Sequence, residues 1–185
     1  MVTTPSVTSS EMRTPPSRAG EDDAMASIWR ALGSIVDPEI PVVSIVELGI
    51  VRDVARAGDE WIITLTPTYS GCPAVRVIEA DVRAAVATTT GAPLRIVTAL
   101  APPWSTDWIA PEARRKLAQA GIAPPGSAGG PADHTQTITF RRAEVRCPNC
   151  GSLRTQELSR FGSTACKAQY RCLDCLEPFD YFKPH

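Results

Sequence analysis

The chain has 185 residues and a mass of 19.8 kDa, which allows one full domain and at most a small appendage. Its composition, 43% hydrophobic and 21% charged, excludes collagen-like, coiled-coil and wholly disordered proteins. The net charge of -1 gives the chain as a whole no electrostatic attraction to nucleic acid or anionic lipid. Without an apolar run of about 18 residues or a basic stretch before an apolar one, the sequence predicts neither a membrane span nor a secretion signal.

Charge and cysteine are distributed unevenly. Residues 1–133 carry 11 Lys+Arg and 15 Asp+Glu, whereas residues 134–185 carry 8 and 5, so the balance changes from -4 to +3. Five of the six cysteines follow position 146. This concentration is typical of a small module that its cysteines hold together locally, and not of a disulfide framework spread over a secreted domain.

The N-terminal part begins with a polar segment. Residues 1–23 are rich in Thr, Ser and Pro without apolar periodicity, which predicts a disordered tail. From Ala24 onwards apolar residues recur at helical spacing, and this predicts a short amphipathic helix that ends at Asp37-Pro38.

The next elements, in chain order, predict a small sheet with helices. Strands are expected at 50–57 and 61–66, joined as a hairpin by the turn residues 57–60. A helix is expected from Cys72-Pro73 to Thr88, a third strand at 94–100 and a last helix at 112–120. Residues 24–121 therefore predict one α+β domain.

Residues 122–133 are rich in Pro and Gly and predict a flexible connector at the domain boundary. Beyond it, residues 134–185 predict a β module that begins with a strand at Thr135–Glu144.

The strongest motif of this module is a pair of Cys-x-x-Cys sequences, Cys147 with Cys150 and Cys172 with Cys175, separated by 21 residues. Each pair brings two thiolates to one ion through a tight turn, and two pairs complete a tetrahedral set, as in a zinc ribbon. The residues between them predict a hairpin bent at 161–164. Structural zinc is the expected occupant, but four thiolates also bind iron or an iron-sulfur cluster, and two disulfides remain an alternative.

Two further thiols stand outside this quartet. Cys166 is either a small buried hydrophobe, a thiolate favoured by Lys167 and Arg171, or a substitute metal ligand. Cys72 is expected at a helix start, where the helix dipole and unpaired N–H groups would lower the pKa of the thiol and make it a better nucleophile and metal ligand. A buried structural cysteine is the alternative for Cys72.

Other candidate residues flank the proline-rich loops. Asp37 and Glu39 surround Pro38 and either cap a turn or contact a bound cation. The loop from Trp104 to Trp108 either covers the end of the sheet or forms a docking surface for a partner.

These motifs resemble, over residues 24–185, the PaaD (PaaJ) family of accessory subunits of the phenylacetyl-CoA epoxidase. The resemblance is carried by the segments that begin at Asp37, Leu48, Thr66 and Pro102 and by the cysteine module that ends at His185. Residues 24 to about 122 are also similar to the wider MIP18-like family of iron-sulfur assembly factors, whose fold is a small sheet packed by helices.

The resemblance implies a role in phenylacetate degradation, assisting assembly or repair of an iron-sulfur or di-iron centre, and no catalysis by the chain alone. It implies that Cys72 makes a transient contact with metal or sulfur, with Asp37 and Glu39 in support. The implied partners are other epoxidase subunits, especially the iron-sulfur reductase or the di-iron subunit, and the implied location is the cytoplasm.

The residues themselves agree on one point. The chain has neither the Glu-x-x-His helices of a di-iron oxygenase nor the Gly-x-Gly-x-x-Gly of a nicotinamide or flavin site. Two other functions stay open: a purely structural subunit, and a zinc ribbon that binds nucleic acid or protein, although few stacking aromatics and a modest charge disfavour nucleic acid.

Overall fold

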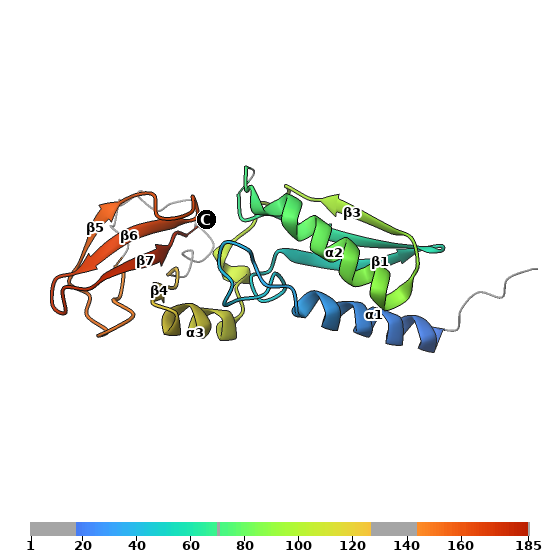
Figure 1. Cartoon of the computed structure of the whole chain (residues 1–185), viewed down its shortest axis with the longest axis horizontal. Coiled ribbons are helices and arrows are strands. Elements are labelled where there is room, and N and C mark those ends of the chain that lie inside the picture. Colours follow the sequence, from blue (N-terminus) through green and yellow to red (C-terminus); the bar gives the residue numbers. More distant parts are fainter. Residues whose placement is uncertain (1–17, 70, 127–143, 185) are drawn as a thin grey trace, which may run out of the picture.

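The structure is a computed structural model that describes residues 18–69, 71–126 and 144–184. Two lobes lie along the long axis of the molecule (Figure 1). The N-terminal lobe contains helices α1 (Arg18–Gly33) and α2 (Ala74–Thr90) with a three-stranded sheet, and the C-terminal lobe contains a four-stranded sheet. The predicted α+β class is confirmed. No helix of the described residues is long and apolar enough to cross a lipid bilayer.

The N-terminal sheet has the order β1-β2-β3. Strands β1 (Val51–Ala57) and β2 (Glu60–Leu65) form the predicted antiparallel hairpin, and β3 (Leu94–Thr98) pairs with β2 in parallel. A parallel pair needs a long crossover, and α2 supplies it. Alternate residues of β2 are buried in the core, namely Trp61, Ile63 and Leu65.

Helices α1 and α2 pack on this sheet and on each other through their apolar stripes. The buried residues are Ile28 and Leu32 of α1 and Ile78, Val82 and Val86 of α2, as the spacing predicted. The tail expected over residues 1–23 was placed too far along the chain, because α1 begins at Arg18. Residues 1–17 of that tail lie outside the described residues.

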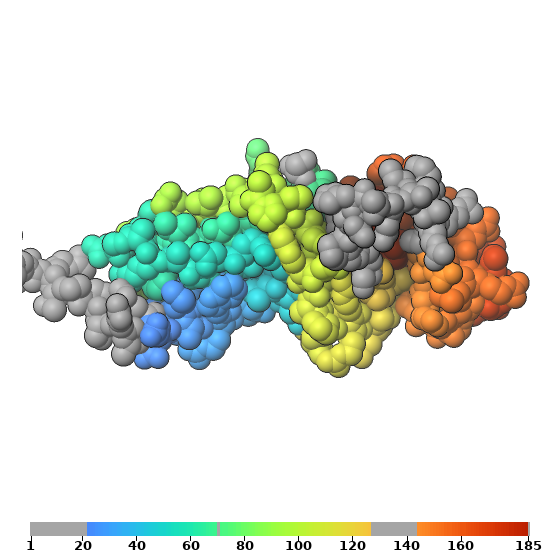
Figure 2. Space-filling model, turned by 180° about the vertical axis from the view of Figure 1, so that it is seen from behind, coloured from blue at the N-terminus to red at the C-terminus, as the bar shows by residue number. Residues whose placement is uncertain are grey.

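Between the sheet and the C-terminal lobe, two loops dock on each other. Residues 47–49 meet the segment 104–116, which contains a 3-10 turn at Thr106–Trp108 and helix α3 (Pro111–Gln119). The N–H of Ala110 donates to the carbonyl of Glu47 at 2.9 Å, and the Glu47 carboxylate pairs with Lys116 at 2.6 Å. In the space-filling view the yellow-green to yellow segment of residues 100–126 lies between the two lobes (Figure 2).

The C-terminal sheet has the order β4-β7-β6-β5. Strands β5 (Thr155–Ser159), β6 (Lys167–Cys172) and β7 (Pro178–Phe182) are antiparallel, and the hairpin between β5 and β6 turns where the sequence predicted it. The short strand β4 (Ile122–Ala123) pairs with β7 in parallel.

Strand β4 differs from the expected connector at 122–133. The Pro and Gly residues of that segment predicted a flexible chain, but its first two residues are apolar, and β7 supplies hydrogen-bond partners for their backbone. The predicted strand at Thr135–Glu144 lies outside the described residues, apart from Glu144, which is not in a strand.

The two lobes share one hydrophobic core. Phe182 of β7 is fully buried in the core cluster of the N-terminal lobe, and its ring lies 5.9 Å from that of Trp104. Cys166, which precedes β6, belongs to the same cluster. The C-terminal lobe is therefore packed against the N-terminal one, and the loop between β5 and β6 reaches the junction between them.

Candidate metal and thiol sites

The four ribbon cysteines converge at one end of the C-terminal sheet. Cys147 and Cys150 precede β5, Cys172 ends β6, and Cys175 lies in the turn before β7. Their four sulfur atoms all lie within 4.8 Å of one another, with 3.8 Å between Cys147 and Cys175 and 3.5 Å between Cys150 and Cys172. In a tetrahedral site with Zn–S bonds of about 2.3 Å, sulfur atoms lie about 3.8 Å apart. The quartet therefore fits one tetrahedral ion.

The backbone around the quartet forms two matching turns. Gly151, directly after Cys150, has a φ of 78°, and its N–H donates to the carbonyl of Cys147 at 2.9 Å. Leu176 occupies the same place after Cys175 and also has a positive φ, 66°, which is uncommon for a residue with a side chain. Such turns direct both sulfurs of a pair toward the same point.

The chemistry of the quartet favours a firmly held soft ion. Hydrogen bonds from the backbone N–H groups of Cys175 and Asp174 lower the pKa of the Cys172 thiol to about 6. At Cys175 the N–H of Glu177 lowers the pKa, but burial and the neighbouring thiols outweigh it and raise the pKa to about 12, so the protons of the quartet are shared unevenly. All six cysteines lie within the described residues and none forms a disulfide, so the two-disulfide alternative is not what the structure contains. Thiolate donors suit zinc and iron alike, and the four sulfurs do not identify the metal.

A second group of reactive side chains lies at the junction of the two lobes. It contains Cys72, which lies just before α2. Its thiol is half-buried, and its N–H donates to the carbonyl of Tyr69 at 3.2 Å. The expected lowering of its pKa was wrong. Burial raises the pKa of the Cys72 thiol, hydrogen bonds from the start of α2 oppose this, and the nearby carboxylates of Glu39 and Asp37 raise it further. Desolvation outweighs the helix start, so Cys72 rests as a neutral thiol.

Asp37 and Glu39 face this centre from the proline turn. The Asp37 side chain is buried, and its Oδ1 accepts the N–H groups of Glu39 and Ile40 at 2.8 and 2.9 Å, so Asp37 does cap the turn. Burial raises the pKa of both carboxyls, and for Glu39 the charge of Asp37 adds to the effect. The turn therefore holds two carboxyl groups whose ionised forms are poorly solvated.

The C-terminal lobe adds a second thiol to this centre. The Cys166 thiol is 3% exposed, lies 3.1 Å from the Thr164 hydroxyl and donates to the Glu39 carboxylate at 3.8 Å. Burial raises its pKa to about 11, so the thiolate expected from neighbouring cations is not the resting form. The buried ammonium of Lys167 lies 3.4 Å from Asp180 and lowers the pKa of Asp37 against the larger effect of burial.

Sequence reasoning did not find three features of this centre. Tyr69 lies beside both thiols, and burial followed by the charges of Cys72, Glu39 and Cys166 raises the pKa of its phenol to about 12. The contact between Glu39 and Cys166 joins residues 127 positions apart, and Lys167 is buried beside it. No local pattern in the sequence marks such a contact.

One end of the Trp104–Trp108 loop covers the core, which was one of the two roles expected for this loop. Trp104 is 4% exposed, donates from its indole N–H to the carbonyl of Leu48 at 3.0 Å and packs against Phe182. Trp108 is half-buried, with the Arg52 guanidinium 3.4 Å from the centre of its ring. Trp104 therefore covers the core and joins the lobes, and a docking role for the rest of the loop stays a prediction. His134 and His185 lie outside the described residues.

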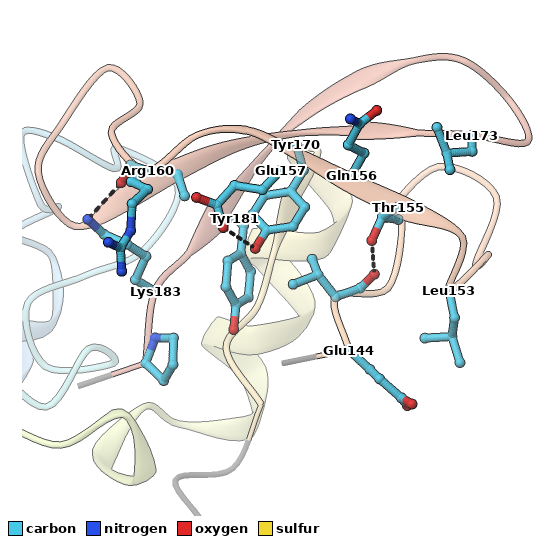
Figure 3. A pocket seen from close by; sticks show the side chains of 13 residues that line it. Glu144, Leu153, Thr155, Gln156, Glu157, Arg160, Tyr170, Leu173, Tyr181 and Lys183 are labelled. Atoms are coloured by element: carbon cyan, nitrogen blue, oxygen red, sulfur yellow. Dashed lines mark hydrogen bonds between the residues drawn. The ribbon is translucent and has the colours of Figure 1, made fainter. Parts of the chain in front are cut away.

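A large cavity lies elsewhere. It has a volume of 870 Å³ and opens on the C-terminal sheet, with Tyr170, Tyr181 and Glu157 among its lining residues (Figure 3). The Tyr170 hydroxyl donates to the carboxylate of Glu157, its partner on the neighbouring strand β5, at 3.2 Å. None of the six cysteines lines this cavity, so it is separate from both thiol sites.

Replacing Asp37 by Asn should reduce the dependence of stability on pH. A carboxyl group whose pKa is raised on folding binds its proton more tightly in the folded chain, so the free energy of unfolding falls as pH rises from the ordinary value of 3.8 through the raised one. Asn keeps the oxygen that accepts two N–H groups but carries no charge. Asp37→Asn should therefore raise Tm at neutral pH and flatten its fall, measured by thermal unfolding between about pH 4 and pH 7.

The exposed Asp81 on α2 provides the control, since Asp81→Asn should leave the pH dependence unchanged. If Asp37→Asn has a lower Tm than the wild type at neutral pH and its Tm changes with pH as steeply as that of the wild type, then burial does not raise the pKa of Asp37.

Two family descriptions match separate parts of the chain. Residues 25–93, which contain Asp37, Glu39 and Cys72, match the family described as iron-sulfur cluster assembly protein. Residues 131–183, which contain the quartet and Cys166, match the PaaD zinc beta ribbon domain. The class is thus an iron-sulfur assembly type of domain joined to a zinc ribbon.

The relatives identify the family within this class. The chain is 49% identical over 156 residues to a protein of Escherichia coli K12 that is named as a putative subunit of the 1,2-phenylacetyl-CoA epoxidase, and the match covers 84% of this chain and 90% of that protein. The chain belongs to the PaaD family. It is also 35% identical over 92 residues to an Fe-S protein maturation auxiliary factor of Porphyromonas gingivalis, covering 49% of this chain and 87% of that protein.

Among solved structures, the chain is similar to a domain of unknown function from Bacillus anthracis. The match has 30% identity and a TM-score of 0.49 and covers 54% of this chain and 97% of that domain.

Proposed function

We propose that this chain assists the assembly or repair of an iron-sulfur or di-iron centre of the phenylacetyl-CoA epoxidase. In this role Cys72 is the transient contact to metal or sulfur, and Asp37 and Glu39 support it. The chain does not oxidise the substrate itself. The expected partners are the iron-sulfur reductase or the di-iron subunit, and the expected location is the cytoplasm.

The observation that carries this proposal is the difference between the two kinds of thiol. In the quartet, four sulfurs are already gathered within 4.8 Å of one another, which favours a permanent ion. Cys72 is half-buried among carboxyls and its pKa is raised. A neutral thiol must lose its proton before it binds a metal, so it binds more weakly at neutral pH and releases the metal more readily.

The ribbon has a different role in this proposal. Its four cysteines, Cys147, Cys150, Cys172 and Cys175, would hold zinc in a closed set with no open coordination position, which is typical of a structural site. A lobe of this size gains much of its stability from such an ion. The metal of the ribbon is therefore expected to stay in place while metal or sulfur passes through the thiol at the junction.

The test replaces the chromosomal gene by variants and measures phenylacetyl-CoA epoxidation by the cells. Cys72→Ser should lower the activity at least about tenfold, because a ligand is lost while the fold and the zinc content remain. The control Ser163→Ala, in the hairpin turn of the ribbon, should be as active as the wild type. Full activity of Cys72→Ser would reduce the chain to a structural subunit and overturn the proposal.

A further inference from the structure

Ligand groups from both lobes meet at the junction. Glu39 and Cys72 come from the N-terminal lobe, and Cys166 comes from the loop before β6. The thiol of Cys166 contacts the Glu39 carboxylate at 3.8 Å, and the charge of Glu39 also acts on the Cys72 thiol. Both thiols act on the Tyr69 phenol that lies beside them. One carboxylate thus lies within electrostatic reach of two thiols that are 94 positions apart in the sequence.

The acidic groups of this region have a cation beside them that is shared with another carboxylate. Asp37 and Cys166 are buried, and Lys167 is the cation that acts on both of them among the described residues. The Lys167 ammonium is itself 3.4 Å from Asp180. Buried acidic groups stay protonated unless a cation comes close, and a metal ion stabilises thiolates and carboxylates that are otherwise costly to ionise.

We propose that Cys72, Cys166 and Glu39 form a second metal site, exchangeable and distinct from the quartet, for a thiophilic divalent cation such as Fe²⁺. This proposal rests on the proposed function and adds to it a ligand from the ribbon lobe. Binding involves no change of oxidation state: each thiol gives up its proton to solvent as its sulfur binds the metal, and Glu39 binds through a carboxylate oxygen.

The three ligand groups are not gathered as tightly as the quartet. The Cys166 thiol and the Glu39 carboxylate are 3.8 Å apart, and the Cys72 side chain would have to turn toward them to complete the site. Cys166 supplies the fixed part, because its thiol is buried and held against the Thr164 hydroxyl. This gives the ribbon a role beyond stability, since its fold presents Cys166 to the N-terminal lobe.

The experiment uses the full chain with its quartet filled by zinc, under anaerobic conditions. Co²⁺ is the probe, because its bonds to thiolates absorb strongly in the near ultraviolet. Equilibrium dialysis measures cobalt and retained zinc per chain in the same samples. The wild type should bind one Co²⁺ in addition to its zinc, with thiolate charge-transfer absorption.

Three variants test the ligands one by one. Cys72→Ser, Cys166→Ser and Glu39→Gln should each weaken Co²⁺ binding at least about tenfold while zinc and Tm are retained. Glu79→Gln, which removes a carboxylate on the surface of α2, should bind like the wild type. If Cys166→Ser does not fold, Glu39→Gln still decides the matter, because Glu39 lies in the other lobe and is only half-buried.

Wild-type Co²⁺ binding by either Cys166→Ser or Glu39→Gln would overturn the composite site, as would the absence of a second metal ion in the wild type. Neither result bears on the cellular activity of Cys72→Ser, so the proposed function would still stand on its own test. Conversely, loss of binding in all three variants with full cellular activity of Cys72→Ser would leave the site in place and refute its role in maturation.

Discussion

Cys147→Ala should remove the metal from the quartet and unfold the C-terminal lobe. Cys147 is 1% exposed and belongs to the small core of this lobe together with Val145, Ala168 and Tyr181. Binding of structural zinc contributes about 10–16 kcal/mol in small zinc domains, far more than a core of this size supplies. Three sulfurs and an alanine cannot complete a tetrahedral set.

Elemental analysis of the purified chain and limited proteolysis measure this outcome. The metal content should fall from one ion per chain to none, and cleavage should become rapid between residues 144 and 184. Ser163→Ala is the control, because it changes an exposed residue of the same lobe outside the quartet and should keep the metal. A protease-resistant Cys147→Ala chain with a full complement of metal would contradict the role given to the quartet.

Gly49→Ala should destabilise the N-terminal lobe by about 2–4 kcal/mol, through two separate effects. Gly49 has a φ of 71°, where a side chain costs about 1 kcal/mol or more. A Cβ atom at this position would also lie 2.7 Å from Cβ and 2.9 Å from the carbonyl oxygen of Trp108. Relief of that overlap has to move the loop that carries Trp104 away from Leu48 and Phe182.

Urea unfolding of Gly49→Ala and Gly58→Ala separates the two effects. Gly58, in the turn of the β1-β2 hairpin, has a similar φ of 62°, but a Cβ there would meet nothing within 4 Å. Gly58→Ala should therefore cost only the backbone term, about 1 kcal/mol. Equal losses in both variants would mean that the approach of Trp108 to Gly49 does not limit stability.

The parts of the fold that depend on local patterns could be predicted from the sequence. The spacing of Ile78, Val82 and Val86 predicted the buried face of α2, and the two Cys-x-x-Cys motifs predicted the gathered sulfurs. Turn residues and helical periodicity are patterns of a few neighbouring positions, so they can be recognised in a single sequence without knowledge of the tertiary structure.

The rest depends on contacts between distant segments. Strand β4 forms because β7 lies beside it and pairs with it. The sequence of residues 122–123 alone cannot predict this pairing. The pKa of Cys72 was predicted in the wrong direction because the helix start is a local feature, whereas burial and the charge of Glu39 come from the tertiary structure. The approach of Cys166 to Glu39 has the same origin.

The six cysteines thus fall into two groups by their surroundings. Four share one small volume where a metal ion can bind all of them, and two lie at the boundary of the lobes beside carboxyl groups. Burial raises the pKa of both boundary thiols, whereas within the quartet the pKa of Cys172 is lowered and that of Cys175 is raised. Four sulfurs gathered at one point suit a resident metal, and the boundary pair is the one that we propose passes metal or sulfur on.

The metal content of the partner subunits tests the maturation role most directly. The iron-sulfur reductase and the di-iron subunit of the epoxidase would be purified from cells that carry Cys72→Ser, and iron and acid-labile sulfide measured per chain. We expect at least one of them to contain less metal than when isolated from wild-type cells. Full iron in both subunits, together with full sulfide in the reductase, would contradict a role of this chain in building or repairing either centre.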